Sequence, residues 1–210
     1  MSDKQIWDIT PLVTSSFPIW PGDEPLQRNI DWDISLGSIV TTSSIKATAH
    51  LGAHADAPSH YAKNGKTIDE CSLDHYLGLC QVIRPNVKHR DAINQKSIKQ
   101  PLLAPRVLFS TSTFDYNKAF SEDFSAFDPD FFEFMAKNNV ITVGIDGPSV
   151  DLFKAEKLPC HQLAYKYNIA LLENLILEEV PEGLYELIAL PLKIKGFDAS
   201  PVRAILRSLE

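Results

Sequence analysis

Short segments with the hydrophobicity patterns of β-strands recur along the chain, either as alternating apolar and polar residues or as brief apolar runs. The expected strands cover residues 6–10, 29–36, 80–84, 106–112, 140–146, 169–172 and 185–193. We expect a short capped helix over residues 72–77 and a longer one that Asp128 and Pro129 open and that runs to about Lys137. Helices intervene between strands, so the pattern predicts an α/β fold with one mixed sheet. The sequence has no linker, repeat or low-complexity tract, which predicts a single domain over residues 1–210.

Polar side chains occupy the even positions between residues 47 and 57, including His50, His54 and Asp56. This alternation is typical of a strand, and a helix fits less well because Gly52 would weaken its centre. An extended chain rises about 3.3 Å per residue, which would place His50 about 20 Å from Asp56. The two residues can share a metal ion only if the chain bends between them, and Gly52 permits a bend. We therefore expect a strand up to about His50 and a shaped loop after it.

Residues 18–23 have the composition of a rigid turn, with prolines on both sides of Trp20 and a Gly-Asp pair at the reversal. Two prolines beside an indole favour a ring that is presented to a ligand. Packing of Trp20 in a core or a dimer interface is the alternative.

Composition and charge narrow the class of protein. Hydrophobic residues make up 44% and charged residues 22% of the chain, as in folded globular proteins. The net charge is −7 and no basic stripe is present, so neither nucleic acid nor a membrane surface is expected as a partner. No apolar run approaches the roughly 20 residues of a membrane span, and the first residues lack a signal-peptide pattern. The three cysteines form no CxxC pair, which favours a reducing compartment, and we expect a cytoplasmic protein.

Three of the six histidines, His50, His54 and His60, fall in one 11-residue window together with Asp56. Imidazoles and a carboxylate are a common ligand set for a divalent metal such as zinc that keeps a position open for water. A polar strand face whose histidines only form hydrogen bonds is the alternative, and the tight spacing favours the metal. The spacing does not distinguish ligands from a proton shuttle. His75 and His89 lack such neighbours, and we expect them at the surface.

The segment from His50 to His60 has the form His-x-Gly-x-His-x-Asp-x-Pro-x-His and resembles the signature of the cyclase-like metal-dependent hydrolases. Within that family the chain is similar to the bacterial kynurenine formamidases (arylformamidases) over nearly its whole length. The matching segments are residues 7–9, 21–23, 54–58, 144–146, 148–149, 187–193 and 198–204. The resemblance implies a swivelling β/β/α fold and a homodimer.

The resemblance also implies a site with two zinc ions per chain, or manganese as the alternative metal. It assigns the metal ligands, a general acid and base, and a residue of the aryl pocket. These are His50, His54 and Asp56 for the first ion, Asp56, His161 and Glu173 for the second, His60 for proton transfer and Trp20 for the pocket.

Two positions depart from the family pattern. Ala53 stands where the family usually has Thr, which removes a hydroxyl but no ligand. The stretch 155–160 before His161 also differs from common versions. Cys160 could serve there as a soft ligand, although its type favours a small buried residue.

The function that the resemblance implies is hydrolysis of N-formyl-L-kynurenine to L-kynurenine and formate in tryptophan degradation. Zinc makes a nucleophile available from water at neutral pH, and an imidazole such as that of His60 suits proton transfer to the departing aniline nitrogen.

Two alternatives stay open. One is a hydrolase of cyclic amides such as isatin, which would use the same metal ligands. The other is a non-enzymatic protein with a structural metal, although such sites are usually closed and rich in cysteine. Ser149 and Ser200 lie in no Gly-x-Ser-x-Gly elbow, so a serine hydrolase is not favoured.

Overall fold

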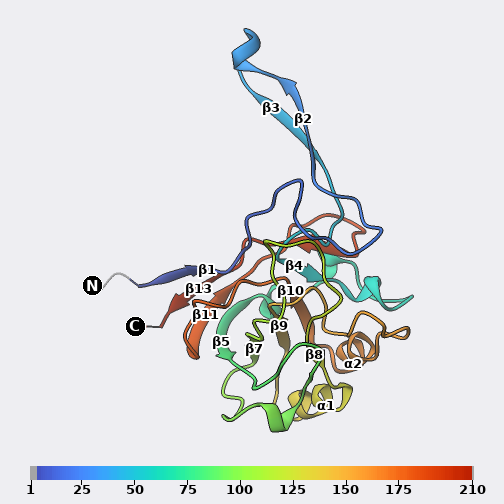
Figure 1. The fold of residues 1–210 in the computed structure, drawn as a ribbon, viewed down its shortest axis with the longest axis vertical. Coiled ribbons are helices and arrows are strands. Elements are labelled where there is room, and N and C mark those ends of the chain that lie inside the picture. Colours follow the sequence, from blue (N-terminus) through green and yellow to red (C-terminus); the bar gives the residue numbers. More distant parts are fainter. Residues whose placement is uncertain (1–3, 210) are drawn as a thin grey trace.

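A nine-stranded mixed sheet organises residues 4–209, the part of the chain that the computed structural model describes. Its strands are β1 (Ile6–Asp8), β4 (His54–Asp56), β5 (Leu77–Ile83), β7 (Arg106–Phe109), β9 (Thr142–Ile145), β10 (Ala170–Glu173), β11 (Gly183–Ile188), β12 (Ala199–Pro201) and β13 (Ile205–Ser208). They lie in the order β1-β13-β11-β5-β7-β9-β10-β4-β12 (Figure 1). The central strands β5, β7, β9 and β10 are parallel, and the flanking strands β11 and β4 pair with them antiparallel.

The remaining elements are small. An antiparallel hairpin consists of β2 (Gln27–Trp32) and β3 (Thr42–Lys46), and β6 (Ala92–Ile93) pairs with β8 (Ala126–Phe127). The α-helices are α1 (Pro129–Lys137) and α2 (Pro159–Tyr167). Short 3₁₀ helices cover Ile34–Leu36, Pro58–His60, Ile68–Glu70, Leu73–His75 and Gln95–Ser97. Within residues 4–209 no helix is long and apolar enough to span a membrane.

The central strands are buried on both faces because an apolar core lies on each side of the sheet. In β7, Val107 and Phe109 contribute to the core that α1 and α2 share, and Leu108 contributes to the opposite core. Phe132 and Met135 of α1 fill the first core and are fully buried. This arrangement confirms the predicted α/β fold with one mixed sheet.

The predicted long helix is confirmed. The side chain of Asp128 accepts a hydrogen bond from the Asp130 N–H, and Pro129 opens α1. The helix ends at Lys137 and Asn139 follows with a φ of 60°. The strands predicted at 140–146 and 169–172 correspond to β9 and β10, and the helix predicted at 72–77 is the 3₁₀ helix Leu73–His75.

Other strand predictions are wrong in extent. The strands predicted at 6–10 and 106–112 end at Asp8 and Phe109. The strand predicted at 29–36 ends at Trp32, and the 3₁₀ helix Ile34–Leu36 follows it. The strand predicted at 185–193 ends at Ile188, before Pro191, which has no N–H to donate to a ladder. The sequence pattern does not predict the strands β3, β6, β8, β12 and β13.

In residues 47–57 the structure confirms the predicted bend but contradicts the predicted strand. Residues 47–53 form no strand, and β4 begins at His54. The reason is that β4 pairs antiparallel with β10 on one side and with β12 on the other, both distant in sequence. The bend at Gly52 is confirmed by its φ of 61°, and a Cβ there would lie 2.6 Å from a methyl carbon of Val13.

The β2–β3 hairpin and its tip, residues 27–46, project from the rest of the chain as an arm (Figure 1). Every residue of both strands is exposed. Several exposed residues are large and apolar, namely Ile30, Trp32, Ile34, Leu36, Ile39, Val40 and Ile45. The arm therefore makes no core with the sheet.

Gly65 packs against the 3₁₀ helix Pro58–His60, and a Cβ on Gly65 would lie 2.2 Å from the Pro58 carbonyl carbon. Because this obstacle is backbone, we expect Gly65→Ala to lower the free energy of unfolding by about 1–3 kcal/mol, as overpacking does. Urea unfolding followed by circular dichroism measures the change.

Gly147→Ala is the matched control, because the nearest atom to a Cβ there lies at 3.7 Å, an ordinary contact. We expect it to change the free energy of unfolding by less than about 1 kcal/mol. Equal losses in the two variants would contradict the steric explanation.

Candidate metal centre

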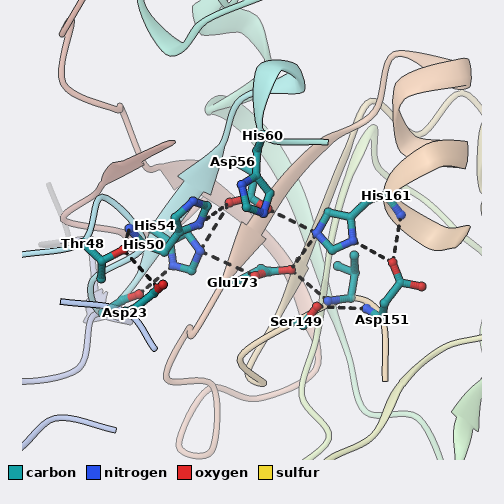
Figure 2. Close-up of polar contacts among 12 residues, drawn as sticks. Asp23, Thr48, His50, His54, Asp56, His60, Ser149, Asp151, His161 and Glu173 are labelled. Atoms are coloured by element: carbon teal, nitrogen blue, oxygen red, sulfur yellow. Dashed lines mark hydrogen bonds and ion pairs between the residues drawn. The ribbon is translucent and has the colours of Figure 1, made fainter. Parts of the chain in front are cut away.

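The neighbouring strands β4 and β10 carry three ionisable side chains. Glu173 pairs directly with His54 across the two strands. His54 and Asp56 are two residues apart in β4, so both side chains lie on one face. The loop before β4 brings His50 to the same place, and α2 brings His161 (Figure 2). Residues that are far apart in the sequence thus converge on one point.

The Asp56 carboxylate lies at the centre of this group. Its Oδ1 atom lies 3.0 Å from Nδ1 of His50 and 3.4 Å from Nε2 of His54, and its Oδ2 atom lies 3.4 Å from Nε2 of His161. The Glu173 carboxylate faces the same two rings, with Oε2 at 3.5 Å from His54 and Oε1 at 3.7 Å from His161. The ligand atoms therefore divide into two adjacent sets, one at each oxygen of Asp56.

These atoms fit bound metal ions. Within residues 4–209, Nε2 of His54 and both carboxylate oxygens of Asp56 are buried without a hydrogen-bond partner. Burying polar atoms without partners costs folding free energy, and coordination to a cation would offset that cost. Three sets of ligand atoms each lie within 4.8 Å of one another. They are His50 with His54 and Asp56, His60 with Asp56 and His161, and His50 with His60 and Asp198. Imidazole nitrogens and carboxylate oxygens are ligands that suit zinc and also manganese.

Hydrogen bonds on the outer side of two rings orient them toward the centre. Nδ1 of His54 lies 2.9 Å from the Gly52 carbonyl oxygen, which leaves Nε2 facing Asp56. Nδ1 of His161 lies 2.6 Å from Oδ2 of Asp151, which leaves Nε2 facing the carboxylates. Partners of this kind fix the tautomer and the direction of a metal-binding imidazole.

Asp151 has a second role at the start of α2. Its carboxylate accepts hydrogen bonds from the backbone N–H groups of Cys160 (2.9 Å) and His161 (3.1 Å). One side chain thus caps the helix and orients the ring that the helix carries. The sequence does not single out Asp151, because no motif links it to a histidine ten residues later.

The carboxylates give the centre a strong preference for positive charge. Burial lowers the pKa of His54, but Asp56 and Glu173 outweigh burial and raise the pKa to about 10. Burial likewise lowers the pKa of His161, and Asp151 and Asp56 raise it to about 10. Burial would raise the pKa of Asp56, yet the surrounding histidines hold it well below the usual range. A place that stabilises imidazolium in this way also attracts metal cations.

His60 lies at the rim of the centre. It follows β4 on the 3₁₀ helix Pro58–His60, and 33% of its side chain is exposed. Its Nδ1 atom lies 3.6 Å from Oδ2 of Asp198, and the same oxygen lies 3.2 Å from Nε2 of His50. An accessible ring of this kind can exchange protons with solvent more readily than the buried rings. Asp198 is a further acidic residue that the sequence does not single out.

A cavity of about 380 Å³ opens beside the centre. Trp20 forms part of its wall and also packs on Phe153, with ring centroids 4.9 Å apart. Trp20 thus lines a cavity and also packs on other aromatic rings, and its role in binding a ligand stays a prediction. The complete lining consists of Pro18, Trp20, Asp23, Thr48, His50, His54, His60, Pro148, Ser149, Leu158, His161, Glu173, Asn174 and Asp198.

Other candidates lie elsewhere or have other partners. Cys160 is fully buried in the core, as its type favours, and its thiol donates to the Phe127 carbonyl (3.3 Å). Ala53 is buried, and its carbonyl accepts a hydrogen bond from the Val202 N–H (2.9 Å), a contact that needs no side-chain hydroxyl.

The surface prediction is right for one lone histidine and wrong for the other. His89 is exposed. His75 is half-buried, with Nδ1 2.9 Å from the Ile141 carbonyl oxygen, and burial lowers its pKa. The polar residues beside His75 did not reveal that a distant segment of the chain covers it.

Comparison of the sequence with known proteins identifies the family of the chain. Residues 7–152 match the model of the Cyclase family ("Putative cyclase"). The chain belongs to the cyclase family. A curated relative, the kynurenine formamidase of Bordetella petrii, is 39% identical over 208 residues, which are 98% of this chain and 99% of that protein.

Solved structures related to this cyclase-family chain share its fold. A protein from Bacillus stearothermophilus described as a "predicted metal-dependent hydrolase" gives a TM-score of 0.82 at 28% identity, over 98% of this chain and 99% of that one. Isatin hydrolase A from Ralstonia solanacearum gives a TM-score of 0.83 at 21% identity, over 98% and 92% of the two chains. At that identity the likeness to isatin hydrolase shows the fold alone.

We expect Asp151→Asn to weaken zinc binding by about 10–100-fold, because the amide cannot hold the His161 ring as the carboxylate does. Competition between the protein and a chromophoric zinc chelator measures the dissociation constant.

Glu133→Gln is the control for the loss of one carboxylate. Glu133 forms an ion pair with Lys137 (2.8 Å) on the outside of α1 and should leave zinc affinity unchanged. An unchanged zinc affinity in Asp151→Asn would show that Asp151 does not support the metal centre.

Proposed function

We propose that the chain is a zinc-dependent amide hydrolase that cleaves N-formyl-L-kynurenine to L-kynurenine and formate in tryptophan degradation. We further propose that residues 1–210 form one hydrolase domain. The observation that carries the proposal is the buried group of histidines and carboxylates that opens onto a cavity with an aromatic wall. The likeness to the Bordetella petrii kynurenine formamidase supports this substrate. The cytoplasmic location expected from the composition stays a prediction.

Five residues would hold the metal in this proposal, and zinc is preferred over manganese for the same ligands. His50, His54 and Asp56 would hold one ion, and Asp56, His161 and Glu173 the other. Zinc at this place would act as a Lewis acid and lower the pKa of a water molecule to about 7, so that a nucleophile is available at neutral pH.

His60 would move the proton during the reaction. Water adds to the formyl carbon, the bond from that carbon to the aniline nitrogen breaks, and the nitrogen must gain a proton to leave as an amine. An imidazole can take a proton from water and return it to the nitrogen at neutral pH. Asp198, at 3.6 Å from His60 Nδ1, would keep the ring turned toward the cavity.

Trp20 would bind the aryl group of the substrate. Its indole forms part of the cavity wall, and its packing on Phe153 holds the ring in place. Stacking of aromatic rings contributes about 0.5–1.5 kcal/mol beyond the burial of their area.

The structural-metal alternative fits less well. Structural zinc sites are usually closed by four protein ligands, whereas this centre opens onto a cavity of about 380 Å³. The cyclic-amide alternative uses the same ligands, so an assay must compare the two substrates directly.

The decisive experiment measures turnover of N-formyl-L-kynurenine and of isatin by purified protein with its zinc content determined. We expect formamide hydrolysis that a chelator abolishes and added zinc restores, with little opening of isatin. His60→Gln should lower kcat by about 10²–10⁴-fold, because glutamine cannot transfer a proton.

Zinc content is the control for the His60→Gln variant. A zinc content equal to that of the wild type supports proton transfer, and loss of zinc would make His60 a ligand instead. Faster turnover of isatin than of N-formyl-L-kynurenine would contradict the proposed substrate.

We also propose that the protein is a homodimer in which the arm, residues 27–46, contacts the second copy. An isolated two-stranded hairpin is marginally stable in water, and a large exposed apolar surface is typical of an interface. The arm supplies 20 residues, and a standard interface uses about 20–30 residues on each side.

Ile39 lies near the tip of the arm and is 94% exposed. We expect Ile39→Asp to convert a dimer into a monomer, because the interface would bury a charge without a partner. Size-exclusion chromatography with light scattering measures the mass. Leu12→Asp is the control, since Leu12 is 87% exposed and lies outside the arm; dissociation by both variants, or by neither, would contradict the role of the arm.

A further inference from the structure

The cavity beside the metal centre contains one carboxylate that the proposed hydrolysis does not use, that of Asp23. The other acidic residues in the lining are Glu173 and Asp198, which face the histidines. The lining residues, all from the described part of the chain, include no lysine and no arginine. A ligand in this cavity therefore meets carboxylates and imidazoles as its charged partners.

A rigid turn places Asp23 next to Trp20. The Asp23 N–H donates to the Trp20 carbonyl oxygen (3.0 Å), and Gly22 between them has a φ of 99°. Pro21 at the second position and glycine at the third are the residues of a type II turn, which confirms the predicted turn. The indole and the carboxylate thus occupy the first and fourth positions of one turn.

Thr48 connects Asp23 to the metal centre. The Thr48 hydroxyl donates to Oδ2 of Asp23 (3.1 Å), and its oxygen accepts a hydrogen bond from the His50 N–H (3.3 Å). Figure 2 shows Asp23 and Thr48 beside His50, at the opposite end of the group from Asp151. The carboxylate of Asp23 therefore has a fixed position relative to the reacting centre.

The charge of Asp23 has no cationic partner within residues 4–209. Its Oδ1 atom makes no hydrogen bond there, and no lysine or arginine lies within ion-pair distance. The neighbouring Glu24, in contrast, pairs with Lys46 (3.1 Å) outside the cavity. A half-buried carboxylate with one free oxygen beside an indole provides the two groups that attract ammonium ions most strongly, a negative charge and an aromatic ring.

We propose that Asp23 determines substrate specificity by binding the α-ammonium group of an amino-acid substrate whose aryl ring lies against Trp20. The inference rests on the proposed function and extends it from the formamide to the other end of the substrate. N-formyl-L-kynurenine carries an ammonium group, whereas isatin and simple anilides carry none. The substrate carboxylate meets no lysine or arginine in the cavity and points toward solvent.

Binding of L-kynurenine tests the proposal without turnover. Isothermal titration calorimetry on the zinc-loaded protein compares L-kynurenine with its desamino analogue, 4-(2-aminophenyl)-4-oxobutanoate. We expect the wild type to prefer L-kynurenine by about tenfold or more, as one charged hydrogen bond provides. Asp23→Asn keeps an acceptor for Thr48 and should abolish the preference, and the matched variant Glu24→Gln should retain it.

Turnover is the second measurement of the experiment. Asp23→Asn should raise KM for N-formyl-L-kynurenine about tenfold and leave kcat/KM for formanilide, a neutral anilide, within about twofold of the wild type. An equal loss for both substrates would mean that Asp23 only supports the turn, and it would overturn the proposal. Equally strong binding of L-kynurenine and its desamino analogue by the wild type would also overturn the proposal. If the wild type hydrolyses neither substrate, the proposed function fails, and the binding preference still decides the role of Asp23.

Discussion

The site depends on one electrostatic constraint, the burial of the Asp56 carboxylate. Only 1% of the residue is exposed, and within residues 4–209 neither oxygen has a hydrogen-bond partner. A buried carboxylate is costly unless positive charge lies beside it. That charge can come from protons on the surrounding imidazoles or from cations that replace them. The raised pKa values of His54 and His161, both about 10, reflect the same need for positive charge beside Asp56.

The sheet keeps this carboxylate in place. Strand β4 is paired on both sides, with β10 and with β12, so its backbone has little freedom to move. The register decides the chemistry, because a slip by one residue would turn His54 and Asp56 to the opposite face. Groups that must move or exchange protons, such as His60, lie on the short helix after the strand instead.

Local signals in the sequence were sufficient for features that depend on neighbouring residues. The helix α1, the turn at 18–23 and the bend at Gly52 follow from proline, glycine and capping residues. His161 and Glu173 entered only through the family resemblance, because their distance from His54 in the sequence hides their proximity in space. Asp151, the pairing of β4 and the burial of His75 depend on contacts between distant segments, which periodicity does not reveal.

The turn that carries Trp20 and Asp23 has a consequence for how such an enzyme can change over evolution. The turn precedes the histidine segment in the chain and shares no residue with β4, β10 or α2. Mutations in this turn can therefore alter the accepted side group of a substrate while every proposed metal ligand is retained. A single scaffold can diversify in this way, with new substrates acquired by replacing a few residues of this turn while the inherited reaction stays the same.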